Sequence, residues 1–171
     1  MTEQTRIAIA GPPFSGKSLV GSILAEKLGL EFVDLDRLIE RRSGSTVPKI
    51  FASVGESGFR ARELRALKEV LELCDVVVSL GGGALLSSTS LRQVLTRCTL
   101  FTLWARADEL VRRSSRGGRP LAPNTESLLQ LLKNRRKHYL SLPNRIDTEG
   151  VTPEKVADRI LSMIGRREDR R

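Results

Sequence analysis

Residues 11–18 read Gly-Pro-Pro-Phe-Ser-Gly-Lys-Ser and match the pattern G-x-x-x-x-G-K-[ST] of a phosphate-binding loop. The segment follows a strand-like run at 6–10 and precedes a helix-like run at 17–28, as such a loop requires. Its glycines let several backbone N–H groups face phosphates at a helix N-terminus. Lys17 would reach the β- and γ-phosphates, and the Ser18 hydroxyl would serve Mg²⁺. The pattern predicts a nucleoside triphosphate site and leaves the phosphoryl acceptor open.

Two carboxylates, Asp34 and Asp36, follow the second strand-like run, 31–34. In an extended segment a spacing of two places both side chains on the same side. One could then orient a water on Mg²⁺, while the other accepts a hydrogen bond from the acceptor hydroxyl. The alternative is that Asp36 only caps the helix that follows. The residues by themselves leave both interpretations open.

A run of three glycines, Gly81, Gly82 and Gly83, follows a buried strand-like run at 75–80. Three glycines in a row cost backbone entropy on folding. A ligand lying directly against the backbone would explain that cost, and a loose turn is the alternative. In open parallel sheets, ligands bind at the carboxyl ends of the strands, which is where this run lies.

Arg60 is predicted in the first turn of a helix that begins at Gly58. A positive side chain opposes the helix dipole there, which favours an anionic ligand or a partner carboxylate. Glu63 lies one turn later and could orient Arg60 as an i, i+3 pair.

The elements that must position these residues alternate between strand-like and helix-like runs, which favours an α/β fold with a parallel sheet. Strands are predicted at 6–10, 31–34, 75–80, 98–104 and 145–147. Helices are predicted at 17–28, 36–42, 58–73, 91–96, 108–113 and 128–139. A last helix is expected to begin at Pro153, with Thr152 as its cap, and to end at Gly165. The polar, glycine-rich run 114–120 is predicted to be a mobile loop.

Length and composition place the chain among single-domain globular proteins. Its 171 residues predict one domain at 1–165, followed by a basic tail at 166–171 that we expect to be disordered. No apolar run approaches the roughly 20 residues that a membrane helix needs. The first residues do not resemble a secretory signal. Two cysteines are too few for a disulfide framework, so a reducing cytoplasm is the expected location.

The formal net charge of +9 is concentrated in three short segments, 112–119, 133–137 and 166–171. Such patches suit either a nucleic acid backbone or a small polyanion held by several arginines. Aromatic residues make up only 4% of the chain and do not alternate with the basic ones, as they do in single-strand binders. We therefore expect no nucleic acid partner.

Taken in order, these features resemble the shikimate kinases. The resemblance rests on the phosphate loop, Asp34-x-Asp36, Phe59-Arg60-x-x-Glu63, Gly81-Gly82-Gly83, Arg119-Pro120-Leu121, and Arg135 followed by Tyr139, and it runs from about residue 6 to residue 164. It implies a P-loop kinase-type three-layer α/β/α fold with a central parallel five-stranded sheet and a mobile lid at about 112–124. The implied reaction is transfer of the γ-phosphoryl of ATP, with Mg²⁺, to the 3-hydroxyl of shikimate by a monomer with no membrane or nucleic acid partner.

The resemblance also implies a role for each matching residue. Asp36 would bind the attacking hydroxyl, Arg60 and Arg135 would clamp the shikimate carboxylate, and Arg119 would close over the transferring phosphate. The expected catalytic residues are Lys17, Asp36 and Arg119; the expected ATP contacts are Phe14, Ser15, Gly16, Lys17, Ser18, Leu19, Arg112, Arg119 and Pro153; the expected shikimate contacts are Asp36, Arg60, Gly81, Gly82, Gly83 and Arg135; and the expected metal partners are Ser18 and Asp34.

One departure from the family and two rival functions follow from the same residues. Phe14 stands where the family most often has glycine, and phenylalanine is strained at positive φ. We expect a slightly different loop conformation and weaker ATP binding. A gluconate kinase-like enzyme is the nearest rival, and a nucleotide-binding module with little or no catalysis is the second.

Overall fold

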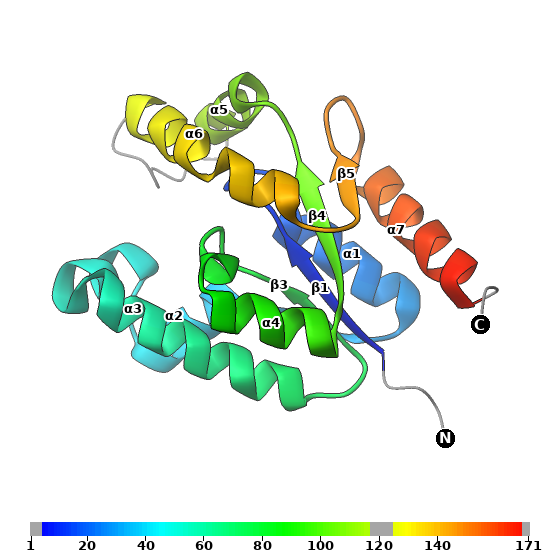
Figure 1. Ribbon diagram of the computed structural model, residues 1–171, viewed down its shortest axis with the longest axis horizontal. Coiled ribbons are helices and arrows are strands. Elements are labelled where there is room, and N and C mark those ends of the chain that lie inside the picture. The colour runs from blue at the N-terminus through cyan, green and yellow to red at the C-terminus, as the bar shows by residue number, and fades with distance from the viewer. Residues whose placement is uncertain (1–4, 117–124, 169–171) are drawn as a thin grey trace.

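The centre of the structure, a computed structural model that describes residues 5–116 and 125–168, is a five-stranded parallel sheet (Figure 1). Its strands are β1 (Arg6–Ala10), β2 (Glu31–Asp34), β3 (Val76–Ser79), β4 (Thr99–Trp104) and β5 (Arg145–Asp147), in the spatial order β2-β3-β1-β4-β5. All four neighbouring pairs are parallel. The predicted fold class and strand count are confirmed.

Helices cover both faces of this sheet and complete three layers (Figure 1). The helices are α1 (Lys17–Leu28), α2 (Leu35–Ser43), α3 (Val47–Glu72), α4 (Ser88–Arg97), α5 (Ala107–Arg116), α6 (Thr125–Ser141) and α7 (Pro153–Glu168), with a single 3-10 turn, η1 (Ala84–Leu86). Helices α1 and α7 pack on one face, and α3 and α4 pack on the other. None of these helices, which span the described residues, is long and apolar enough to cross a membrane.

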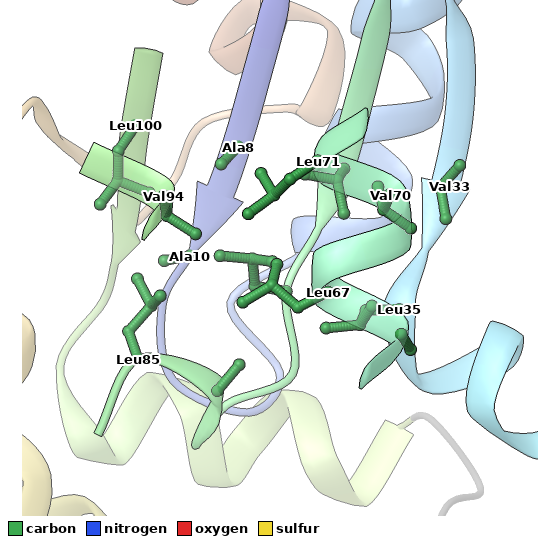
Figure 2. Close-up of a cluster of buried hydrophobic side chains, with 14 of the residues drawn as sticks. Ala8, Ala10, Val33, Leu35, Leu67, Val70, Leu71, Leu85, Val94 and Leu100 are labelled. Carbon is green, nitrogen blue, oxygen red and sulfur yellow. The ribbon is translucent and has the colours of Figure 1, made fainter. Parts of the chain in front are cut away.

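The alternation of side chains along β1 explains how both faces are filled. Ile7 and Ile9 point to the α1–α7 layer, whereas Ala8 and Ala10 point to the α3–α4 layer. The small alanines leave space for Leu67 and Leu71 of α3, which Figure 2 shows beside them. Burial on both faces is typical of central strands in parallel sheets.

Several predicted helix boundaries were wrong, and α4 and α6 each begin three residues earlier than predicted. The helix predicted from Gly58 is the second part of α3, which begins at Val47 and kinks at Gly55, where φ is 70° and ψ is −178°. Helix α7 continues through Gly165 to Glu168, because Gly165 does not take a positive φ and a glycine within a helix costs only about 1 kcal/mol. Helix α5 extends to Arg116, so residues 112–116 of the predicted lid are helical. The rest of the predicted lid, residues 117–124 with Arg119, lies outside the described residues.

Candidate functional site

A pocket of about 550 Å³ opens at the carboxyl ends of β1, β2 and β3. It is lined by twelve of the predicted site residues: Phe14, Gly16, Lys17, Ser18, Leu19, Asp34, Asp36, Arg60, Gly81, Gly82, Gly83 and Arg135. They come from the phosphate loop (residues 11–18), α1, the end of β2, α2, α3, the glycine loop (residues 81–83) and α6. Residues far apart in the sequence therefore meet in one cavity, as expected at this edge of a parallel sheet.

The phosphate loop owes its shape to three residues with positive φ. Gly11 has φ 143°, and a Cβ atom there would lie 2.3 Å from the carbonyl oxygen of Leu103. Gly16 has φ 91° and begins α1. Phe14 has φ 63°, so it adopts the left-handed conformation expected of the family's glycine, and the loop is not rearranged to avoid it. The Ser15 hydroxyl is buried beneath the loop and has no hydrogen-bond partner among the described residues.

Lys17 lies folded back over the phosphate loop. Its ammonium group donates a hydrogen bond of 2.8 Å to the carbonyl oxygen of Pro12. Burial lowers the pKa of Lys17 to about 8, although the nearby carboxylates of Asp36 and Asp34 act in the opposite direction. A phosphate group would supply negative charge that compensates for the hydration the ammonium group loses on burial.

Ser18 and Asp34 form the part of the site that suits Mg²⁺. The Ser18 hydroxyl donates a hydrogen bond of 2.5 Å to Asp34 Oδ2. Among the described residues, no group of three or more His, Cys, Asp or Glu side chains could enclose a metal. Mg²⁺ bound to nucleotide phosphates keeps several waters and needs only one or two protein oxygens. A hydroxyl beside a carboxylate, next to the phosphate loop, fits that requirement.

Asp34, and not Asp36, caps α2. The Asp34 side chain accepts a hydrogen bond of 3.1 Å from the backbone N–H of Arg37. The residue between the two carboxylates, Leu35, begins α2 and is fully buried in the core, so the pair is not in an extended segment. The interpretation of Asp36 as a helix cap was therefore wrong, and its carboxylate is free of that role.

The Asp36 carboxyl group lines the pocket, and its pKa is higher than usual. Burial raises its pKa to about 6, and repulsion from the Asp34 carboxylate adds to this effect, while Lys17 acts against it. A pKa closer to neutrality makes a carboxylate a better proton acceptor for an attacking hydroxyl.

Arg60 lines the same pocket and is held by two glutamates. Its guanidinium group lies 2.6 Å from Glu63 Oε2 and 3.3 Å from Glu56 Oε1. The predicted i, i+3 pair is confirmed. Glu63 is only 4% exposed, its Oε1 has no hydrogen-bond partner among the described residues, and it also lines the pocket. Glu63 was not predicted as a site residue, although its spacing of three from Arg60 predicts contact between the two side chains.

The glycine loop is shaped by the protein's own side chains. A Cβ atom at Gly81 would lie 2.6 Å from Asp36 Oδ1, and one at Gly83 would lie 2.4 Å from a nitrogen of Arg60. The Gly82 carbonyl accepts a hydrogen bond from the Tyr139 hydroxyl and a long one, of 3.4 Å, from Arg135. The glycines thus make room for Asp36 and Arg60, and the loop is neither loose nor in need of a ligand to explain it.

Two of the expected ATP contacts, Arg112 and Pro153, do not line this pocket. Arg112 is half exposed and binds both oxygens of Glu109 at 2.7 Å. Its neighbour Arg113 reaches the loop that precedes α7, where it donates to the hydroxyl and the carbonyl of Thr148 at 3.0 and 2.8 Å. Pro153 is the first residue of α7, as predicted. Arg113 also pairs with Glu109 at 2.7 Å, so it bridges α5 and the loop before α7, whereas Arg112 binds Glu109 alone among the described residues.

Together these groups can bind a triphosphate and a divalent cation. They can also bind an acceptor molecule with its hydroxyl at Asp36 and its carboxylate at Arg60. Phosphoryl transfer depends mainly on such positioning and charge neutralisation.

Comparisons with known proteins agree with that chemistry. A model of the shikimate kinase family matches residues 13–165. A shikimate kinase of Thermus thermophilus is 35% identical over 98% of this chain and 94% of its own, and one of Salinispora arenicola is 39% identical over 91% and 95%. A solved structure described as shikimate kinase from Acinetobacter baumannii in complex with shikimate is 32% identical, with a TM-score of 0.85 over 95% of this chain and 93% of its own.

The alternative hypothesis of a gluconate kinase-like enzyme has weaker support. A gluconokinase structure from Sinorhizobium meliloti is 18% identical, with a TM-score of 0.64 over 95% of this chain and 93% of its own. At that identity the likeness shows a shared fold and does not indicate a shared substrate.

Proposed function

The chain belongs to the shikimate kinase family, and we propose that the pocket at the carboxyl ends of β1, β2 and β3 is where its reaction takes place. The enzyme transfers the γ-phosphoryl group of ATP to the 3-hydroxyl of shikimate, in the route to chorismate and the aromatic amino acids. The observation that carries the assignment of the site is the convergence of Lys17, Asp36 and Arg60 on one cavity.

On the donor side, the backbone N–H groups of the phosphate loop and the Lys17 ammonium group bind the triphosphate. Ser18 and Asp34 are the residues that would hold Mg²⁺ or its waters. When bound, Mg²⁺ neutralises negative charge on the β- and γ-phosphates. Lys17 leaves the Pro12 carbonyl and binds the phosphates, since a charged oxygen is the stronger acceptor.

On the acceptor side, Asp36 accepts a hydrogen bond from the 3-hydroxyl and takes its proton as the new O–P bond forms. Its pKa of about 6 leaves most of the group ionised at neutral pH while keeping it basic enough for that transfer. Arg60 and Arg135 bind the shikimate carboxylate, and the glycine loop lies beside them. Glu63 fixes the guanidinium group of Arg60 from behind.

Several finer points are also our proposals. Arg119 supplies a positive charge to the transferring phosphoryl group, by its position in the sequence. Arg113, which binds the loop before α7, replaces Arg112 as the expected arginine on the nucleotide side. The enzyme acts as a monomer in the cytoplasm, and light scattering of the purified protein measures its mass in solution.

The assignment is tested by ADP release with Mg-ATP and shikimate, gluconate, a nucleoside monophosphate or no acceptor. We expect strong stimulation by shikimate alone. Asp36→Asn should then lower kcat by at least about 100-fold, which is within the range that general bases contribute. Asp108→Asn is the matched control, since Asp108 is an exposed carboxylate that pairs only with the exposed Arg106 among the described residues. Equal activity of the two variants would remove Asp36 from the mechanism.

A further inference from the structure

The backbone of Phe14 adopts a conformation that is unfavourable for a residue with a bulky side chain. Its φ of 63° lies in the left-handed region, which costs free energy for a residue with a bulky side chain. Glycine would form the same loop without that cost. The phenyl ring must therefore contribute something that glycine lacks, and its surroundings indicate what it is.

The ring packs against a hydrophobic cluster that is separate from the two clusters on the two faces of the sheet. The buried members of this third cluster are Ala105, Leu110, Leu128 and Leu132. Leu110 belongs to α5, while Leu128 and Leu132 belong to α6. The two helices lie side by side beyond the end of β4 (Figure 1). Phe14 thus ties the phosphate loop to the α5–α6 layer through apolar contact.

Helix α6 carries acceptor-side groups into the pocket. Leu131 packs against the same cluster as Phe14, and Arg135 follows it by one helical turn. Phe14, Leu131 and Arg135 all line the pocket. Arg135 makes a long hydrogen bond of 3.4 Å to the Gly82 carbonyl and interacts with the hydroxyl of Tyr139, also on α6. A bond of 3.4 Å positions a guanidinium group weakly, so the packing of α6 contributes to the placement of Arg135.

We propose that Phe14 is a positioning residue for shikimate binding: its ring fixes the distance between the phosphate loop and Arg135. The inference rests on the proposed function of the pocket. The ring joins the donor side and the acceptor side of the site, because one residue contributes its backbone to the phosphate loop and its side chain to the packing of α6. Removal of the ring should therefore weaken shikimate binding more than ATP binding.

Three variants separate the effect of the ring from the effect of the backbone strain. Phe14→Gly removes the ring and the backbone strain, Phe14→Ala removes the ring and keeps a Cβ atom, and Phe14→Leu keeps most of the apolar contact. We expect the KM for shikimate to rise about tenfold in the first two and less than about threefold in the third, in keeping with the cost of a small misplacement of a binding group. The KM for ATP should change less than the KM for shikimate in each variant. Leu129→Ala is the matched control, since Leu129 is an exposed leucine of α6 outside the cluster.

Hydrogen exchange of the α6 amides in the free protein provides a second readout that needs no substrate. We expect faster exchange over residues 128–135 in Phe14→Gly than in the wild type or Leu129→Ala. An unchanged KM for shikimate, a loss confined to ATP, or unchanged exchange in α6 would each overturn the proposal. If the wild-type protein fails to bind shikimate by calorimetry, the proposed function falls, and the exchange measurement still decides whether Phe14 holds α6.

Discussion

Arg60→Ala should damage both shikimate binding and stability, through two different interactions of one side chain. A charge-assisted hydrogen bond to the shikimate carboxylate is worth about 1.5–3 kcal/mol, which corresponds to a rise of about 10- to 150-fold in KM. The same change leaves Glu63, whose side chain is 5% exposed, without its partner at 2.6 Å. Breaking a buried ion pair costs about 3–5 kcal/mol, and we expect about 1–3 because Arg60 is itself 27% exposed.

The two effects can be separated by a second substitution at Glu63. In Arg60→Ala/Glu63→Gln the unpaired buried charge is gone, so the melting temperature should recover by about 2–4 °C per kcal/mol regained. The KM for shikimate should stay high, because no guanidinium group has been restored. Arg62→Ala serves as the control on the same helix, since its side chain is exposed and donates to the carbonyl of Gly58.

The assays are coupled ADP release across shikimate concentrations and thermal unfolding of the same preparations. The reasoning fails if the double variant recovers its KM along with its stability. That result would mean that Arg60 only neutralises Glu63 and that the carboxylate of shikimate binds elsewhere. An unchanged KM in Arg60→Ala alone would refute it more simply.

Other outcomes follow from the pocket's charges. Asp36→Asn should raise stability at pH 7 by about 1–3 kcal/mol, because a carboxyl group whose pKa rises from 3.8 to about 6 on folding destabilises the native state at higher pH. Urea unfolding should show this gain shrink as the pH falls from about 6 and vanish below about pH 3, where the group is protonated in both states. ATP binding near pH 8.5 should take up protons, since Lys17 has a pKa of about 8 in the free protein and is charged beside phosphates, and calorimetry in buffers of different ionisation enthalpy measures this uptake. Asp34→Asn should increase the Mg²⁺ concentration needed for half-maximal activity several-fold, which a magnesium titration checks. Arg113→Ala should raise the KM for ATP more than Arg112→Ala does, and equal effects would contradict the proposal that Arg113 lies on the nucleotide side.

The sequence was a good guide wherever a local pattern determines the outcome. The phosphate loop, the five strands and the pairing of Arg60 with Glu63 all depend on spacing within a few residues. The expectation that the loop would change its conformation around Phe14 was wrong, because Phe14 keeps a positive φ of 63°. What it does there could not be predicted, because the cluster against which the ring packs comes from residues about 90–120 positions away.

Two pairs of neighbouring residues show where local reasoning stops. Asp34 and Asp36 look alike in sequence, and the core position of Leu35 decides which one caps α2. Arg112 and Arg113 differ by one position, and only the helix phase of α5 separates the exposed ion pair from the contact with Thr148. The reason for the glycine loop was missed because it lies in the side chains of Asp36 and Arg60, which approach it in space.

The strand order has a consequence for how the chain can be synthesised. In the sheet, β1 pairs with β3 and β4, while β2 pairs with β3 alone, so the first two strands never contact each other through hydrogen bonds. Everything before Val76 therefore leaves the ribosome without a strand partner, including the phosphate loop and both aspartates of the pocket. In the folded sheet, β3 lies between β2 and β1 and so joins the two halves of the site. A nascent chain that stops before Val76 leaves both earlier strands without a hydrogen-bonded neighbour, a condition that favours aggregation.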